Sequence, residues 1–379
     1  MRYYCFKPAT LLTGIFILCC ACTYAQQEAP WSGFGIENNF IAGKVWKHEA
    51  KFDAPIPTIS TGDDINFVLQ THGKKDWEQR RNFPVVGIGF NYTHYGIDSV
   101  YGRCYSIYPN IQIFLVRSKH LEWTLRLGDG VGYVTKRFQR TAPVDTLNNA
   151  IGSHVNDFAL FMTDLRYHIN KHFDVQIGAN FQHISDASFR QPNLGINMYG
   201  AHIGIRYSPV DAHPKGLVRD LPKLKNRWLI QAHITMAGDE SSAPQGPEYP
   251  AYLGALYVSR RWLSKNKFFG GIDYSYHESI YAFLRNNEIY PGQESAHSWK
   301  SAVFVGNEFL VGRFGIVGQV GVYIKQAYLT TDPYYEKLGL NYYIIRKEQG
   351  PVKEFFLTGM LLVHQAIAEL GEFGIGAGF

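Results

Sequence analysis

A histidine and a serine two residues apart are the residues of this sequence best suited to chemistry. They are His183 and Ser185, which end the segment FDVQIGANFQHIS at residues 173–185. In a β-strand alternate side chains share a face, so their Cα atoms would lie about 7 Å apart and their side chains would point the same way. An imidazole in that place can accept the serine proton as the hydroxyl oxygen attacks an ester carbonyl.

The face that carries this pair is otherwise apolar. Its earlier members are Phe173, Val175, Ile177, Ala179 and Phe181, whereas the opposite face carries Asp174, Gln176, Gly178, Asn180 and Gln182. If the apolar face meets lipid, a polar pair on it is costly and indicates a function. The competing interpretation is a polar pair at the rim of a barrel, where polar groups are tolerated. Position alone favours neither interpretation.

A second copy of the motif, His277-Glu278-Ser279, gives the opposite result. There Ile272, Tyr274, Tyr276 and Ile280 form the apolar face, so the histidine and the serine fall on the polar face. We expect this copy to face a water-filled lumen and to be inert.

The segment INMYGAHIGIRY (196–207) supplies a possible third member of the site. Asn197 begins its apolar face, just as Ser185 ends the apolar face of the preceding segment. An amide can hold a histidine tautomer, but it does not stabilise an imidazolium as a carboxylate does.

The composition favours a membrane barrel. Charged residues make up 18% of the 379 residues and aromatic residues 15%, whereas soluble domains carry about 25% charged residues. The mean hydropathy is −0.18, and beyond the N-terminus no apolar run approaches the roughly 18 residues of a spanning helix. We therefore expect an all-β fold, an antiparallel transmembrane β-barrel of the bacterial outer membrane with about 14–16 strands.

Alternating hydrophobicity between turn signals predicts sixteen strands, although fourteen fits nearly as well. They are expected near 33–45, 62–72, 84–95, 104–117, 121–136, 156–169, 173–187, 196–208, 227–237, 252–263, 268–281, 299–311, 314–326, 338–347, 353–365 and 369–379. We prefer one closed barrel to two, because closure removes the sheet edges and one C-terminal strand signal then serves the whole chain. So wide a barrel would hold water or need a plug.

The lengths of the connections predict which end of the barrel faces outward. Long connections are expected at 46–61, 137–155 and 282–298, and tight turns at 118–120 and 170–172. Outer-membrane barrels have long external loops and short periplasmic turns. The strand that ends in His183 and Ser185 should therefore reach its end near the outer leaflet.

Both ends of the chain carry targeting patterns. Residues 1–25 contain basic Arg2 and Lys7, an apolar stretch and a small residue at Ala25, which predicts a signal peptide cleaved after Ala25. The mature chain would keep Cys104 as its one cysteine, which excludes an internal disulfide and a thiol metal cluster. The last residues, GEFGIGAGF, alternate and end on Phe379, which resembles the assembly signal of outer-membrane barrels.

The segment HISDASFRQPNLGIN (183–197) resembles the active-site segment of the lipid A 3-O-deacylases, the PagL-type or acyloxyacyl-hydrolase-like outer-membrane proteins. HGKKDW (72–77), RLGDGVGYVTK (126–136) and NNAIGSH (148–154) resemble, in order, pieces of the long members from the Bacteroidetes. The resemblance covers about 62–208. It implies an outer-membrane barrel with a lipid-facing Ser-His site that removes the ester-linked hydroxyacyl chain at position 3 of lipid A.

The resemblance also assigns roles to single residues. Ser185 would be the nucleophile and His183 the general base. Asn197 stands where the family has a glutamate. Asp186 replaces an asparagine of the oxyanion hole, and Ser188 replaces a glycine whose backbone N–H contributes to it. A carboxylate there repels the developing oxyanion unless it is protonated or turned away, and one lost donor costs about 10²–10³ in rate.

Further predictions concern the substrate and the domains. Arg190 and Asn193 are candidates for substrate binding, with the guanidinium on a lipid A phosphate; an ordinary solvated loop charge is the competing interpretation of Arg190. The resemblance divides the chain into a signal peptide (1–25), a deacylase-like first half of the barrel (26–208), a periplasmic connection (209–225) and a C-terminal half of the barrel (226–379), which resembles no family from its sequence.

The expected partners are lipid A or lipopolysaccharide in the outer leaflet and the outer-membrane assembly machinery. Nucleic acid is excluded because an exported chain without a basic cluster has no surface for it. We expect no cofactor, and no metal site because the histidines lack ligand spacing. The leading hypothesis is a lipid A esterase. The alternatives are an inactive barrel that acts as a porin, transporter or structural protein, and a phospholipase-like esterase.

Overall fold

The structure is a computed structural model that describes residues 31–379 apart from 223–225, 241–243, 245, 263–264 and 366. The signal peptide expected at 1–25 lies outside the described residues. The described chain is all-β, and its strands are β1 (Phe34–Trp46), β2 (Ser60–Gln70), β3 (Val85–His94), β4 (Arg103–Arg117), β5 (Leu121–Val134), β6 (Val155–His168), β7 (Phe173–Ser185), β8 (Ile196–Tyr207), β9 (Trp228–Glu240), β10 (Glu248–Trp262), β11 (Asn266–His277), β12 (Trp299–Val311), β13 (Phe314–Lys325), β14 (Tyr334–Arg346), β15 (Glu354–His364) and β16 (Ile367–Gly378).

Short helices occupy two of the connections. They are α2 (Asp76–Arg80) between β2 and β3, and α3 (Glu278–Asn286) with the 3₁₀ turn η1 (Glu294–His297) between β11 and β12. The predicted strand at 268–281 therefore ends early, because the chain turns into α3 at Glu278. Within the described ranges, each helix is too short or too polar to cross a bilayer.

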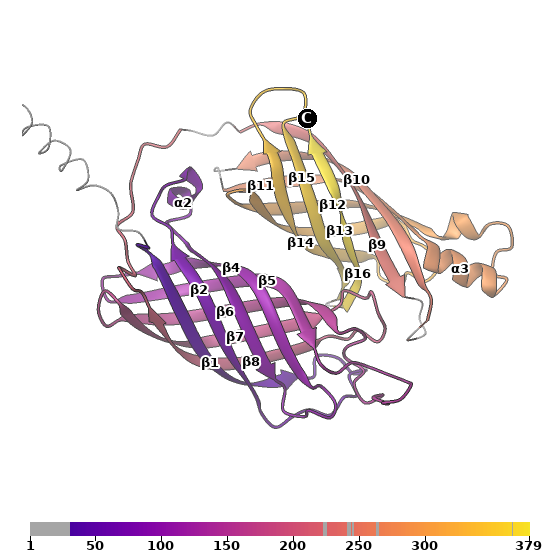
Figure 1. Cartoon of the computed structure of the whole chain (residues 1–379). Helices are drawn as coiled ribbons and strands as arrows, with labels where there is room; N and C mark the ends of the chain where they lie inside the picture. The colour runs from indigo at the N-terminus through magenta and orange to yellow at the C-terminus, as the bar shows by residue number, and fades with distance from the viewer. Residues whose placement is uncertain (1–30, 223–225, 241–243, 245, 263–264, 366) are drawn as a thin grey trace, which may run out of the picture.

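The strands close into two antiparallel barrels of eight, so the preference for one large barrel was wrong (Figure 1). In the first barrel β1 pairs with β8, from Ile36 opposite Tyr207 to Trp46 opposite Asn197. In the second barrel β16 pairs with β9. Each barrel thereby removes its own edges. An eight-stranded barrel is just wide enough for side chains to fill its interior. Paired charged side chains occupy the interiors of both barrels.

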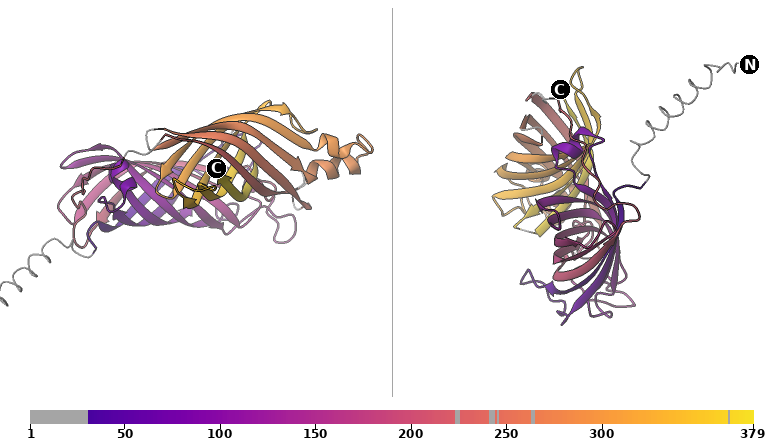
Figure 2. Two further views of the ribbon diagram at one scale, coloured as in Figure 1. Left: turned by 90° about the horizontal axis from the view of Figure 1, so that it is seen from above. Right: turned by 90° about the vertical axis from the view of Figure 1, so that its left-hand side faces the viewer.

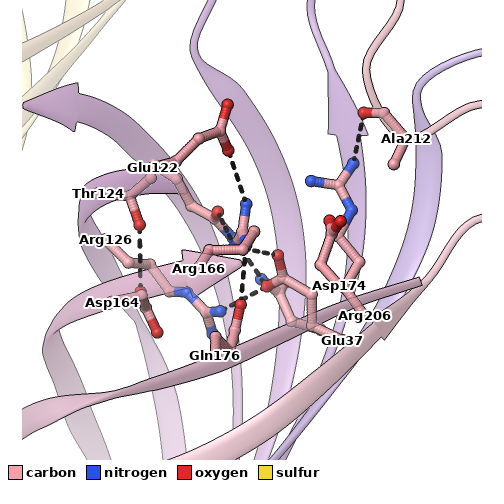
Figure 3. Close-up of polar contacts among 12 residues, drawn as sticks. Glu37, Glu122, Thr124, Arg126, Asp164, Arg166, Asp174, Gln176, Arg206 and Ala212 are labelled. Atoms are coloured by element: carbon pink, nitrogen blue, oxygen red, sulfur yellow. Dashed lines mark hydrogen bonds and ion pairs between the residues drawn. The ribbon is translucent and has the colours of Figure 1, made fainter. Parts of the chain in front are cut away.

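Buried charges fill the lumen of the first barrel (Figure 3). Glu37 of β1 accepts hydrogen bonds from the guanidinium groups of Arg126 and Arg166, the latter at 2.7 Å, and Arg126 also contacts Asp64 at 2.7 Å. All four side chains are fully buried. Because an unpaired buried charge is costly, these pairs from four strands favour closure around one another.

The second lumen is filled in the same way by other residues. Lys267 lies 2.9 Å from Glu308 and 2.8 Å from Glu354, and Lys337 lies 2.8 Å from Glu372. As far as the described residues extend, neither lumen is the wide aqueous channel that a sixteen-stranded barrel would enclose.

The barrels lie side by side and point the same way (Figures 1 and 2). The connections from β7 to β8 and from β11 to β12, which includes α3, are at the ends that we take as external. At the opposite end, Arg81 after α2 donates a 2.9 Å hydrogen bond to the carbonyl of Leu310, and its guanidinium lies 3.4 Å from the ring of Phe309. The second barrel is thus docked at this end as well as near the site described next.

Candidate active site

The candidate site lies on the outer wall of the first barrel, where β7 ends and β8 begins. The outward side chains of β7 include the exposed Val175 and Ile177, and His183 and Ser185 follow with the same alternation. The antiparallel register sets Asn197 of β8 directly opposite His183. The pairing of two strands therefore brings together three residues that are up to 14 positions apart in the sequence.

Hydrogen bonds connect these three side chains in a row. The Nε2 atom of His183 lies 2.9 Å from Oγ of Ser185, and its Nδ1 atom lies 2.6 Å from Oδ1 of Asn197. Since the amide oxygen only accepts, Nδ1 carries the hydrogen, and we assign the tautomer on that ground. Nε2 is then the acceptor of the Ser185 hydroxyl, as a general base requires.

The loop after Ser185 contains the predicted oxyanion region. The N–H of Asp186 donates to Oδ1 of Asn193 at 3.1 Å, so Asn193 holds the loop closed across its base. Ala187 and Ser188 both adopt left-handed backbone conformations, with φ of 56° and 66°. A glycine takes such angles without strain, but alanine and serine do so at a cost that their surroundings must offset.

The Asp186 side chain is buried and faces its own loop. Its carboxyl lies toward the N–H groups of Arg190 and Ser188 and the hydroxyl of Ser153, although neither of its oxygens makes a hydrogen bond of good geometry within the described structure. Burial, with a smaller contribution from the charge of Glu240, raises the pKa of Asp186 to about 7. A substantial fraction of this carboxyl is therefore neutral near pH 7, which lessens its repulsion of an oxyanion.

Arg190 is not a free cation in this structure. Its guanidinium lies 3.4 Å from Glu240 and also pairs with Glu248, both on the second barrel. These carboxylates compete with any phosphate for the guanidinium, so its contact with lipid A phosphates stays a prediction.

Sequence reasoning missed several residues that surround Ser185. The serine is only 2% exposed and borders a cavity of about 40 Å³. The other residues lining the cavity come from β7, from the connections after β1 and before β8, and from the second barrel: His48, Glu49, His183, Asn193, Leu194, Leu361, Val363 and Ala368. No local pattern marks Leu361, Val363 and Ala368, because only the docking of the two barrels brings them to the site.

Only the histidine of the second His-x-Ser motif lies inside the second barrel, and it bonds a different serine. His277 is buried, and its Nε2 atom lies 2.9 Å from Oγ of Ser275 rather than near Ser279. Ser279 lies in the first turn of α3 and donates to Asp239 at 2.6 Å. The lumenal position that the alternation predicted for His277 is the one observed.

One group of possible metal ligands lies at the other end of the first barrel. Ligand atoms of Glu122, His168 and His213 fall within 4.8 Å of one another. Asp174 contacts both histidines, at 2.9 and 3.1 Å, and Arg117 lies 3.0 Å from Glu122. These contacts form a charge network whose arginine lowers the affinity for a further cation. It is distant in the fold from Ser185.

Comparison with known proteins identifies both halves of the chain. The family model described as lipid A 3-O-deacylase (PagL) matches residues 64–206. The model described as acyloxyacyl hydrolase, C-terminal domain, matches residues 228–379, the half for which the sequence alone suggested no family. Among curated proteins no relative matches.

Solved structures with some likeness are outer-membrane proteins. Neisserial surface protein A is 12% identical, over 47% of this chain and 97% of its own, with a TM-score of 0.34. The outer membrane enzyme PagL is 16% identical, over 44% of this chain and 97% of its own, with a TM-score of 0.28. A porin of Rhodopseudomonas blastica is 7% identical, over 91% of this chain and 99% of its own, with a TM-score of 0.18. Likenesses this weak carry no argument.

The two family models together match most of both barrels, and they agree with the resemblance of residues 183–197 to the deacylase active-site segment. The family acts on lipid A in the outer membrane of bacteria. This chain belongs to the PagL family of outer-membrane lipid A 3-O-deacylases and carries in addition the C-terminal acyloxyacyl hydrolase domain.

Proposed function

We propose that this protein is an active esterase that removes the ester-linked hydroxyacyl chain at position 3 of lipid A, with Ser185 as nucleophile and His183 as general base. The observation that carries the proposal is the hydrogen-bonded row of Ser185, His183 and Asn197 on the outer wall of the first barrel, where it borders a cavity shared with the second barrel. A structural barrel has no need of a serine, a histidine and an oriented amide aligned on that wall.

The reaction follows from these positions. Oγ of Ser185 attacks the ester carbonyl while Nε2 of His183 accepts its proton, and Asn197 keeps the hydrogen on Nδ1. The oxyanion forms beside the loop that begins at Asp186. The intermediate collapses as His183 returns the proton to the sugar oxygen, which leaves as a hydroxyl. Water, activated by the same imidazole, then releases the fatty acid from Ser185.

The porin alternative is less well supported by the two lumens. Both are closed eight-stranded barrels whose interiors contain paired charges, and barrels of this size are filled by side chains. The outward Phe373 and Ile375 of β16 suit a lipid-facing last strand, which supports the proposed recognition by the outer-membrane assembly machinery.

The deciding experiment incubates the full protein, purified and folded in detergent, with lipid A and follows the products by mass spectrometry. We expect the loss of one hydroxyacyl chain by the wild type. Ser185→Ala should lower this activity by about 10³-fold or more, because the nucleophile is removed.

Ser275→Ala is the matched control, because it removes a serine that also bonds a histidine at 2.9 Å but inside the second lumen. It should leave the rate within about twofold of wild type, in line with a residue away from the reacting atoms. Folded wild-type protein that leaves lipid A intact over long incubation would refute the proposal. Release of a chain from phospholipid instead of lipid A would identify the phospholipase-like alternative.

A further inference from the structure

The loop that follows Ser185 rests on the second barrel as well as on its own. The Oγ atom of Ser188 donates a 3.0 Å hydrogen bond to the carbonyl of Ala368 on β16. The backbone N–H of Gln191 donates to the carboxylate of Glu240 at the end of β9. Both ends of the segment 188–191 are therefore held by polar contacts to the second barrel.

Glu240 is a buried carboxylate that binds the loop, rather than a surface charge. Its carboxylate is buried, and it receives the guanidinium of Arg190 at 3.4 Å in addition to the N–H of Gln191. A buried carboxylate requires such partners, and removing its charge loosens every group that it holds. The contacts of Ser188 with Ala368, and of Arg190 and Gln191 with Glu240, thus make the position of the loop depend on the second barrel.

Two glycines of the second barrel allow the loop after Ser185 to approach it closely. A Cβ atom at Gly371 would lie 2.7 Å from the Cβ of Ala187, and one at Gly238 would lie 3.0 Å from the ring of Phe189. A separation of 2.7 Å is closer than two carbon atoms pack, so any larger residue at Gly371 must displace the loop.

These contacts fall on the strained part of the loop. Ser188 has φ of 66° at the position where the resemblance expects a glycine, which would adopt that angle without strain. Its hydroxyl makes the bond to Ala368 that a glycine lacks the atoms to make. The contact with the second barrel therefore offsets a conformational cost that the serine introduces.

The second barrel also forms a wall of the reaction site. The cavity beside Ser185 is about 40 Å³, which is enough for one or two waters. Across it from His183 and Ser185 lie three residues of β15 and β16, namely Leu361, Val363 and Ala368. An acyl chain whose carbonyl reaches Ser185 must pass against these apolar side chains.

We infer that the second barrel is a positioning and specificity element of the deacylation site. Through Glu240, Gly371 and Ala368 it holds the oxyanion loop in its reactive conformation. Through Leu361 and Val363 it forms the wall that the apolar chain of the substrate contacts. This inference rests on the proposed esterase function and extends it, because it assigns a role in the reaction to the half of the protein that contains no catalytic residue.

The test uses the full-length protein and two readouts. The first is the rate at which a fluorophosphonate probe labels Ser185, which reports the nucleophile and its loop without reference to lipid A. The second is kcat and KM on lipid A. Gly371→Val should lower the labelling rate and kcat by about tenfold or more, because displaced loop donors no longer stabilise the oxyanion. Glu240→Gln, which keeps the size of the side chain, should lower both by about three- to tenfold.

Gly318→Val is the matched control, since it makes the same change on β13, where a Cβ would meet nothing within 4 Å. It should keep the wild-type labelling rate, and heat-dependent gel migration confirms that each variant is folded. Wild-type labelling rates in both Gly371→Val and Glu240→Gln would overturn the inference. If the probe labels Ser185 but the protein does not deacylate lipid A, only the proposed substrate is refuted, and the labelling rates of the variants still decide the role of the second barrel. If the probe never labels the wild type, both the esterase function and the inference are refuted.

Discussion

Each barrel contains a histidine that lies 2.9 Å from a serine, yet the two pairs sit in opposite environments. His183 and Ser185 lie on the outer wall of the first barrel, and a second hydrogen bond to Asn197 orients the imidazole. His277 and Ser275 point into the lumen of the second barrel. A hydrogen bond between a histidine and a serine therefore does not make a site by itself. The face of the strand, the orienting group and the adjoining loop distinguish the two pairs.

The largest difference between the two pairs is expected when the imidazole of each is removed in turn. His183→Gln should lower deacylation of lipid A by about 10²–10⁴-fold, the usual contribution of general acid–base catalysis. His277→Gln should leave the rate within about twofold, because its imidazole touches no reacting atom. Rates measured by mass spectrometry on both folded variants make the check, and equal losses would erase the distinction drawn here.

The next effect concerns Asp186, which has no counterpart in the second pair. Asp186→Asn exchanges a carboxyl for an amide that can donate to the oxyanion, and we expect a gain of about 10²-fold at pH 8. Burial holds the pKa of Asp186 at about 7, so the wild-type side chain is neutral below that pH and charged above it.

The advantage of Asp186→Asn should therefore grow by about tenfold between pH 6 and pH 8, as the wild-type carboxyl ionises. The ratio of the two rates across this range is the measurement, and it cancels the titration that both proteins share. A ratio that stays constant with pH would show that the carboxyl does not face the developing charge.

A smaller effect is expected from the residue that orients His183. Asn197→Glu places a carboxylate where the amide oxygen now lies 2.6 Å from Nδ1. It should raise kcat by about tenfold, because a carboxylate stabilises the imidazolium that forms during attack. Asn197→Leu serves as the contrasting variant and should lower kcat. An unchanged rate in both would remove Asn197 from the site.

The smallest effect tests the wall that the second barrel contributes. Leu361→Ala enlarges the cavity next to Ser185, and it should shift the preference between long and short acyl chains by about threefold, the effect of a modest change in an apolar pocket. Competition between lipid A species that differ in chain length measures the shift. Leu338→Ala is a suitable control, because Leu338 is exposed on β14 and does not line the cavity.

Much of this arrangement was predictable because alternate residues of a strand point to opposite faces, so a short stretch of sequence shows which side chains share a face. Alternation alone assigned His183 and Ser185 to the outer wall and His277 to a lumen, and sixteen strands were expected close to their observed bounds. Asn197 was found because β7 and β8 are neighbours in the sequence, so their register follows from the turn between them.

The closure of the barrels was not predictable in the same way. A strand of one large barrel and a strand of two small ones show the same alternation, and the choice depends on the pairing of β1 with β8 and of β9 with β16. The lumenal partners of Glu37 are likewise far apart in the sequence. For the same reason Glu240, Gly371 and Leu361 were missed, since their role exists only once one closed barrel rests against another.

The connection between the barrels, residues 208–227, has a consequence for how the site behaves in a cell. Had the second barrel been a separate protein, the share of complete sites would rise and fall with the abundance of both partners. A covalent tether of this length turns association into an intramolecular step at an effective concentration in the millimolar range. Specific activity per molecule should therefore stay constant at any expression level, as in an obligate dimer made permanent within one polypeptide.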